Sequence, residues 1–287
     1  MRRVLVTGAA GRIGRPVLSL LASRGVAATA LVLEDPGSLP AGRVVVGSAE
    51  DVDVVRSAME GADAVIHLAA RPAPHYDTPV DVFAGNTRAT FIVLEEAGIA
   101  GVRRAVIASS YGATGLPWTR EPVPPAYLPI DEALPPVVED PYGLSKQADE
   151  LTAAMMARRH GLTVVALRYP FVGGVEERLA AHARSLAEDP SRGVRDLWSY
   201  LDVRDAALAA VSALSVSDGR AHVAFVAAPT TLVPVPTAEL LRRYLPGVPV
   251  RRALPGRSVP VDTSAAARLF GFAAQYPYSD GSGAAAG

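Results

Sequence analysis

The only lysine in this chain lies four residues after a tyrosine. Of the 28 basic residues 27 are arginine, and Lys146 follows Tyr142 in the segment Tyr-Gly-Leu-Ser-Lys. On a helix, residues four apart share a face, so the ammonium group and the phenol would converge on one point. A free phenol, with a pKa of about 10, is a poor base at neutral pH, and a neighbouring ammonium stabilises its phenolate form. The pair therefore predicts proton transfer by Tyr142, supported by Lys146.

A glycine-rich segment near the N-terminus has the composition of a phosphate-binding turn. Residues 7–14 read Thr-Gly-Ala-Ala-Gly-Arg-Ile-Gly, between an apolar strand pattern and an amphipathic helix pattern. Small residues there let the backbone approach a pyrophosphate, whose charge meets the N–H groups and the positive end of the helix. The segment predicts a dinucleotide-binding site. The residues expected to contact the cofactor are Gly8, Ala10, Gly11, Arg12, Ile13 and Gly14.

An acidic residue about 20 residues beyond the last glycine usually holds the adenosine ribose of such a cofactor. Glu34 occupies that place. A carboxylate near the 2′-hydroxyl favours NAD and repels the phosphate of NADP, whereas Arg12 would have the opposite effect. Glu34 is equally well explained as a solvated strand end. The expected cofactor is NAD or NADP, with a slight preference for NAD.

A serine pair ends the strand pattern of residues 104–108. Open α/β sheets bind ligands at the carboxyl ends of their strands. Ser110 is therefore expected to hold a substrate oxygen against the phenol of Tyr142. Ser109 is a weaker candidate for this contact with the substrate. The alternative is that both serines only cap the end of the strand and do not contact a substrate.

Short apolar strands alternate with helix patterns through the first 168 residues. The expected strands are 3–7, 28–33, 43–46, 64–68, 104–108 and 162–168, and the expected helices are 11–24, 51–59, 79–97 and 142–160. This alternation is typical of βαβ crossovers, so it predicts an α/β fold with a doubly wound parallel sheet of the Rossmann type.

The alternation divides the chain into two parts. Residues 1–168 are expected to form the NAD(P)-binding Rossmann domain, and residues 169–278 mostly a small C-terminal substrate-binding cap, with about 200–228 returning to the Rossmann core. A proline-rich stretch, 116–141, is long enough to be a functional loop. The Gly/Ala/Ser-rich segment 279–287 is expected to be a disordered tail.

Composition excludes several classes of function. The chain has 287 residues, no cysteine and a formal net charge of −1. Without cysteine there is no disulfide framework, thiolate nucleophile or sulfur-based zinc site, and no metal is expected. A near-neutral charge gives no electrostatic footprint for nucleic acid or an anionic membrane. With no apolar run of about 18 residues, the chain is expected to be a soluble, cytoplasmic protein that acts on a small molecule.

Taken in order, these motifs make the chain resemble the extended short-chain dehydrogenase/reductases, also called the NAD-dependent epimerase/dehydratase family. The resemblance rests on residues 7–14, His67-Leu68-Ala69-Ala70, 86–90, Ser109-Ser110, 142–146, Arg168-Tyr169-Pro170 and 198–203. It implies that Tyr142 is the general acid/base, that Lys146 supports it and binds the nicotinamide ribose, and that Ser110 orients the substrate. It further implies cofactor contacts from Ser48, Ala49, Leu68, Ala69, Ala70 and Tyr169. It also implies a homodimer built through helices 79–97 and 142–160.

Departures from the family pattern narrow the expected function. Val32 stands where members usually carry the acidic strand end, and Tyr111 follows Ser110 in place of the acidic pair used for dehydration. Only about two dozen residues separate Gly173 from Trp198, a short segment that resembles the sugar-acid dehydrogenases of the family.

The leading hypothesis is an NAD(P)-dependent oxidoreductase that interconverts a secondary alcohol and a ketone on a small sugar or sugar acid. The alternative is a nucleotide-sugar epimerase that uses the same residues with a transient ketone. A non-catalytic nucleotide sensor is a third hypothesis, which the Tyr–Lys pair argues against. The candidate substrate contacts are Arg71, His75, Tyr111, Arg178 and Arg184.

Overall fold

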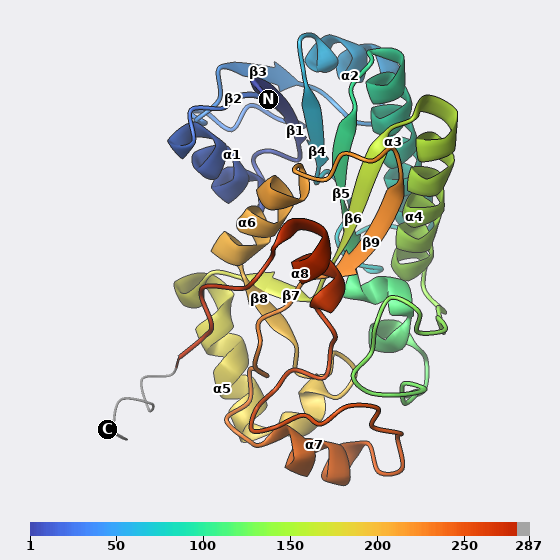
Figure 1. The fold of residues 1–287 in the computed structure, drawn as a ribbon, viewed down its shortest axis with the longest axis vertical. Helices are drawn as coiled ribbons and strands as arrows, with labels where there is room; N and C mark the ends of the chain where they lie inside the picture. The colour runs from blue at the N-terminus through green and yellow to red at the C-terminus, as the bar shows by residue number, and fades with distance from the viewer. Residues whose placement is uncertain (280–287) are drawn as a thin grey trace.

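A seven-stranded parallel sheet forms the centre of the molecule (Figure 1). The computed structural model describes residues 1–279. The strands, in the spatial order β3-β2-β1-β4-β5-β6-β9, are β1 (Arg3–Thr7), β2 (Ala27–Val32), β3 (Arg43–Val46), β4 (Ala64–His67), β5 (Arg104–Ser110), β6 (Thr163–Tyr169) and β9 (Ala221–Phe225). The order reverses between β1 and β4, which confirms the predicted doubly wound sheet of the Rossmann type.

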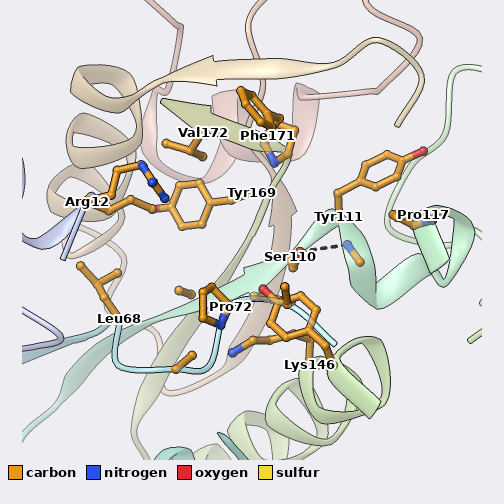
Figure 2. A pocket seen from close by; sticks show the side chains of 18 of the residues that line it. Arg12, Leu68, Pro72, Ser110, Tyr111, Pro117, Lys146, Tyr169, Phe171 and Val172 are labelled. Atoms are coloured by element: carbon orange, nitrogen blue, oxygen red, sulfur yellow. Dashed lines mark hydrogen bonds between the residues drawn. The ribbon is translucent and has the colours of Figure 1, made fainter. Parts of the chain in front are cut away.

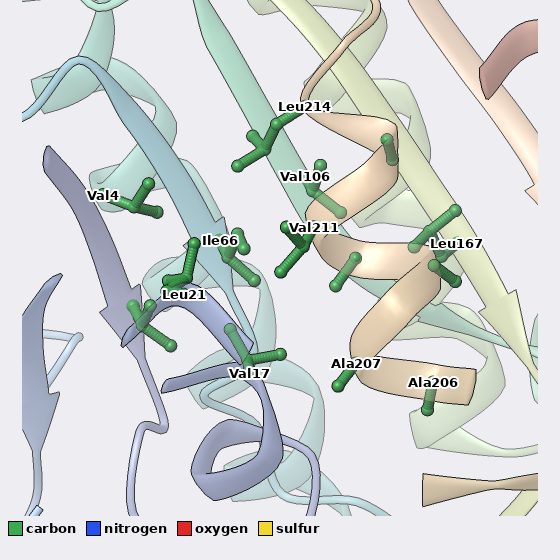
Figure 3. Packing of buried hydrophobic residues seen from close by; sticks show 14 of the residues in the cluster. Val4, Val17, Leu21, Ile66, Val106, Leu167, Ala206, Ala207, Val211 and Leu214 are labelled. Atoms are coloured by element: carbon green, nitrogen blue, oxygen red, sulfur yellow. The ribbon is translucent and has the colours of Figure 1, made fainter. Parts of the chain in front are cut away.

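Helices cover both faces of this sheet. One face carries α1 (Gly14–Ser23) and α6 (Val203–Ala213), and the other carries α2 (Val52–Met59), α3 (Pro79–Ile99) and α4 (Pro141–His160). Successive strand residues point to opposite faces, so Val4 packs with the first group and Leu5 with the second. Figure 3 shows the first of these cores, in which residues of α1 and α6 meet Val4, Ile66, Val106 and Leu167 of the strands.

The start of α4 is fixed by its own sequence. The Asp140 side chain accepts a hydrogen bond from the backbone N–H of Gly143 at 2.8 Å, and Pro141 occupies the first helical position. Both features are typical of helix N-termini. The helix ends at Gly161, which adopts a left-handed φ of 65°. These signals place Tyr142 in the first turn and Lys146 in the second.

A smaller lobe lies beyond the carboxyl edge of the sheet (Figure 1). It contains the two-stranded sheet of β7 (Phe171–Gly173) and β8 (Tyr200–Asp202) together with α5 (Ala180–Glu188) and α7 (Thr237–Tyr244). The short helices of this part of the chain are η1 (Tyr111–Thr114), η2 (Leu116–Trp118), η3 (Val175–Leu179) and η4 (Pro190–Gly193).

The proline-rich stretch 116–141 belongs to this lobe. Leu128 pairs with Val250 and Ile130 with Val261, and both leucine and isoleucine are fully buried. The backbone N–H of Leu128 donates to the Pro249 carbonyl at 2.8 Å. The stretch is therefore a packed wall of the lobe.

The end of the described chain returns to the Rossmann core. Helix α8 (Ser264–Phe270) and Phe272 pack with the α1–α6 cluster. Except for Ser279, the tail predicted for 279–287 lies outside the described residues. No helix in residues 1–279 is long and apolar enough to cross a membrane.

Candidate active site

A cavity of about 630 Å³ lies at the carboxyl edge of the sheet, where the smaller lobe covers it. Its walls come from the segments that follow β1, β4, β5 and β6, from the first turns of α4, and from η3 and the chain before β8. Figure 2 shows Arg12 and Leu68 at one end and Tyr111 and Pro117 at the other, with Ser110 and Lys146 between them. Parallel strands bring these distant segments to one edge.

The glycine loop has the shape that a pyrophosphate requires. Gly8 has a φ of 63°, and a Cβ added to it would lie 2.7 Å from the backbone nitrogen of Ala69. A Cβ on Gly14 would lie 2.7 Å from the Cα of Ala9. Helix α1 has no acidic residue in its first turn, so its positive end stays available to an anion. The residues present therefore fit a dinucleotide cofactor.

Part of the predicted cofactor set lines the cavity, namely Gly8, Gly11, Arg12, Ile13, Gly14, Leu68, Ala70, Tyr142, Lys146 and Tyr169. The remaining members, Ala10, Glu34, Ser48, Ala49 and Ala69, do not line it. Glu34 is exposed two residues beyond Val32, the buried last residue of β2. The structure thus places no carboxylate at the end of β2 itself.

Tyr142 presents a free hydroxyl to the cavity. Its side chain is buried, and the edge of its ring meets Trp118 at a centroid distance of 5.4 Å and an angle of 89°. Within residues 1–279, no group hydrogen-bonds the phenol oxygen of Tyr142. A hydroxyl that lies in a cavity without a protein partner is available to a ligand.

Lys146 carries a buried counter-ion that the sequence analysis did not identify. Its Nζ lies 3.0 Å from the Asp149 carboxylate and 5.7 Å from the centre of the Tyr142 ring. Burial is the largest single influence and would lower the pKa of Lys146, but the acidic groups around it, Asp149 foremost with Tyr142 and Glu150, together raise that pKa above its ordinary value. Lys146 therefore stays charged. The signal for Asp149 was its spacing of three residues from Lys146 on one helix face.

His67 anchors the same cluster from β4. Its Nδ1 lies 2.7 Å from the Thr7 hydroxyl and its Nε2 lies 3.2 Å from that of Thr90. Burial, together with the charge of Lys146, lowers the pKa of His67 to about 3. His67 is therefore neutral at physiological pH, and its role is to hold the ends of the strands and helices together.

Ser110 and Tyr142 approach each other across Gly112. A Cβ on Gly112 would lie 3.2 Å from both Ser110 Oγ and Tyr142 Cε1, and 2.5 Å from the ring of Trp118. The Ser110 oxygen accepts a hydrogen bond from the Gly112 N–H at 2.9 Å, which leaves its own proton free to donate. Ser109 instead donates to Glu150 at 2.6 Å, so it has a structural partner.

The five candidate substrate residues separate in space. His75, Tyr111 and Arg178 line the cavity. Arg71 does not line it and is paired with Glu50 at 2.7 Å and with Asp77 at 3.2 Å. Arg184 lines a second, smaller cavity of about 130 Å³.

Arg178 is a free cation at the cavity wall. Its guanidinium stacks on the Phe171 ring at 3.9 Å from the centroid, and its stem crosses Gly173, where a Cβ would collide with it. Within residues 1–279 no carboxylate pairs with Arg178, whereas the neighbouring Arg12 is paired with Glu177 at 2.7 Å. Burial and the charge of Arg12 lower the pKa of Arg178, as expected for a cation without a counter-ion.

The part of the chain that the structure describes contains no group of three or more histidine, cysteine or acidic side chains placed to hold a metal ion.

Comparisons with known proteins find a matching family model and relatives similar in sequence. The model of the NAD-dependent epimerase/dehydratase family matches residues 4–227. The chain is 33% identical to an L-arabinose 1-dehydrogenase (NAD(P)(+)) of Haloferax volcanii, over 69% of this chain and 77% of that protein. It is 32% identical to a 3-diazoavenalumate denitrifying reductase of a Streptomyces species, over 90% of this chain and 86% of that protein.

A solved structure extends the likeness to the whole fold. A short-chain dehydrogenase/reductase superfamily protein from Agrobacterium tumefaciens, with bound NAD, superimposes with a TM-score of 0.70 at 26% identity. The match covers 96% of this chain and 93% of that one.

Proposed function

Because the chain belongs to the NAD-dependent epimerase/dehydratase family, whose members are enzymes of the extended short-chain dehydrogenase type, we propose that it is an NAD(P)-dependent oxidoreductase. It interconverts a secondary alcohol and a ketone on a small sugar or sugar acid. The observation that carries the proposal is one cavity in which the free hydroxyl of Tyr142, the charged Lys146 and the donor hydroxyl of Ser110 lie beside the glycine loop.

In the oxidation, Tyr142 as phenolate takes the proton of the substrate hydroxyl, and Ser110 donates a hydrogen bond to the same oxygen. Lys146 stabilises the phenolate because its ammonium stays charged beside the ring. General acid–base assistance of this kind contributes roughly 10²- to 10⁴-fold to the rate. When bound, the nicotinamide supplies the hydride acceptor.

We propose NAD or NADP as the cofactor, with a slight preference for NAD. Two features support this preference. Glu34 lies two residues beyond the end of β2, and the cation of Arg12 is already paired with Glu177. An arginine held by a carboxylate attracts a 2′-phosphate less than a free one does.

A homodimer through α3 and α4 is part of the proposal. Phe91 on α3 and Leu144 and Leu151 on α4 are large apolar side chains with much of their surface exposed. A second copy would cover them in a four-helix arrangement. We propose the cytoplasm, which supplies NAD(P), as the compartment in which the enzyme works.

The function is tested with purified protein and a panel of neutral sugars, uronic acids and nucleotide sugars, each with NAD and with NADP. We expect net formation of NAD(P)H with a free sugar or a sugar acid, and a higher kcat/KM with NAD. Mixtures without sugar serve as the control. A nucleotide sugar converted to its epimer with no net NAD(P)H would replace the dehydrogenase with an epimerase.

Arg178 is proposed to bind the carboxylate of a sugar acid. Replacing it with glutamine should raise KM for a uronic acid by roughly 10- to 100-fold, the range for a lost hydrogen bond to a charged group, and leave KM for a neutral sugar unchanged. The matched control is Arg184→Gln, which removes a guanidinium from α5 outside the cavity. Equal effects of Arg178→Gln on acidic and neutral sugars would contradict the assignment.

A further inference from the structure

Asp196 is an unpartnered carboxylate in the wall of the cavity. It lies between η4 and β8 and lines the cavity together with Tyr111 and Pro117. Within residues 1–279 no donor hydrogen-bonds its carboxylate and no basic side chain forms an ion pair with it. The adjacent Arg195 is occupied elsewhere, because its guanidinium donates to the carbonyl oxygens of Pro117 and Thr119.

The backbone around Asp196 is held firmly. Its carbonyl accepts hydrogen bonds from the N–H and the hydroxyl of Ser199, at 3.0 and 2.6 Å. Between them, Leu197 and Trp198 adopt left-handed φ values of 51° and 52°, which are rare for residues other than glycine. The Trp198 indole N–H donates to the Pro190 carbonyl at 2.7 Å and keeps this turn in place. The acid is therefore presented to the cavity by a defined turn.

The charges around Asp196 show which end of the cavity it occupies. Burial raises the pKa of Asp196 to about 6, and the charge of Arg195 opposes that rise. Burial and the charge of Asp196 together raise the pKa of Tyr111 well above its ordinary value, so the carboxylate lies near that phenol. Tyr111 directly follows Ser110 and lies away from Arg12 in Figure 2. Asp196 thus belongs to the substrate end.

We propose that Asp196 determines substrate specificity by accepting hydrogen bonds from two neighbouring hydroxyl groups, so that the substrate is a vicinal diol. This inference rests on the proposed function and names its substrate class. An ionised carboxylate only accepts hydrogen bonds, on two oxygens, which matches a pair of O–H donors. A cationic group would be repelled by Arg178, which lines the same cavity and has no carboxylate partner within residues 1–279. Neutral hydroxyls are therefore the donors that fit.

The test is Asp196→Asn, which keeps the size of the side chain and removes its charge. With D-galactose and D-galacturonate as probes, KM should rise roughly 10- to 100-fold, kcat should stay within a few-fold, and Kd for the cofactor should not change. With 2-deoxy- and 4-deoxy-D-galactose, which between them interrupt every pair of neighbouring ring hydroxyls, the sugar that lacks a hydroxyl of the bound pair should have a similar KM with the variant and the unmodified enzyme. The matched control is Asp189→Asn, a half-exposed acid of the same lobe that pairs with Ser191 and lies outside the cavity.

A pH profile separates this role from a structural one. KM of the unmodified enzyme should rise as the pH falls through about 6, because protonation turns one of the two acceptor oxygens into a donor. Tyr111 stays neutral and Arg178 and Lys146 stay charged in this range, which leaves His75 and Tyr142 as the other cavity groups to be separated from Asp196. The rise should disappear in Asp196→Asn and persist if His75 or Tyr142 causes it.

Three outcomes decide the proposal. An Asp196→Asn enzyme with the KM and pH profile of the unmodified enzyme overturns it while the proposed function stands. If the unmodified enzyme turns over none of the sugars, the proposed function fails and this inference fails with it. If Asp196→Asn does not fold, the pH profile of a His75→Gln enzyme decides, because it removes the histidine that could also cause the rise. A KM that stays constant from pH 5 to 8 in that enzyme overturns the inference, and a rise below pH 6 supports it.

Discussion

Replacing Tyr142 with phenylalanine should lower kcat by roughly 10²- to 10⁴-fold and leave Kd for NAD(P) unchanged. The substitution removes one oxygen atom, and within residues 1–279 that oxygen has no hydrogen-bond partner to lose. The ring keeps its edge-to-face contact with Trp118 at 5.4 Å, so the first turn of α4 should stay in place. The expected result is an inactive enzyme of normal stability. Steady-state kinetics, cofactor titration and thermal unfolding measure the three quantities.

The control for this substitution is another tyrosine that loses its hydroxyl away from the cavity. Tyr127 donates to Asp131 at 2.6 Å within the proline-rich stretch, and it does not line the cavity. Tyr127→Phe should reduce stability slightly and leave kcat unchanged. A Tyr142→Phe enzyme that keeps more than a third of the original kcat would show that the phenol does not transfer the proton.

The parts of the site that the sequence predicted are those that depend on local geometry. Tyr142 and Lys146 share one helix, and the periodicity of that helix alone places them on one face. The glycine loop joins a strand to a helix, so its position at the carboxyl edge follows from the βαβ pattern. Neither inference needed a contact between segments that are distant in the sequence.

Contacts between distant segments explain what the sequence did not reveal. Arg178 and Arg184 are six residues apart and looked equivalent, but Arg178 lies in the π-helical turn of η3. Residues six apart do not share a helix face, and the two guanidinium groups reach different cavities. The pairing of Leu128 with Val250 likewise depends on packing across more than a hundred residues, which no local pattern encodes.

Asp196 shows a third reason why a functional residue can escape prediction from the sequence. Its segment has no glycine at the positions that adopt left-handed φ values, so the turn that presents the acid has no sequence signal. Leu197 and Trp198 are both almost fully buried, and their tertiary packing holds the backbone in this unfavourable conformation. The core of the smaller lobe thus positions Asp196, the side chain proposed to determine specificity. One helix, α4, positions Tyr142 and Lys146, the pair proposed to transfer the proton.

The Lys146–Asp149 pair predicts pH shifts of the same sign for its two members. Lys146→Met removes the positive charge beside the phenol, so the phenolate forms only at higher pH and the acid limb of kcat for oxidation should move upward. Asp149→Asn leaves the ammonium buried without its counter-ion at 3.0 Å, which lowers the pKa of Lys146. A lysine that loses its proton more easily stabilises the phenolate less, so the acid limb should again move to higher pH. Initial rates between pH 5 and 10 measure both shifts.

The free energy of unfolding of the same variants provides a control for the kinetic measurements on Lys146 and Asp149. Both side chains are buried, with exposed fractions of 4% and 1%, so Lys146→Met leaves a carboxylate without its partner. Loss of one member of a buried pair reduces the free energy of unfolding by about 3–5 kcal/mol. The double variant Lys146→Met/Asp149→Asn should recover much of that loss, because no unpaired charge remains, while its kcat stays low. If the acid limbs of both single variants coincide with that of the unmodified enzyme, the ammonium does not control the phenol, and the role given to Lys146 is wrong.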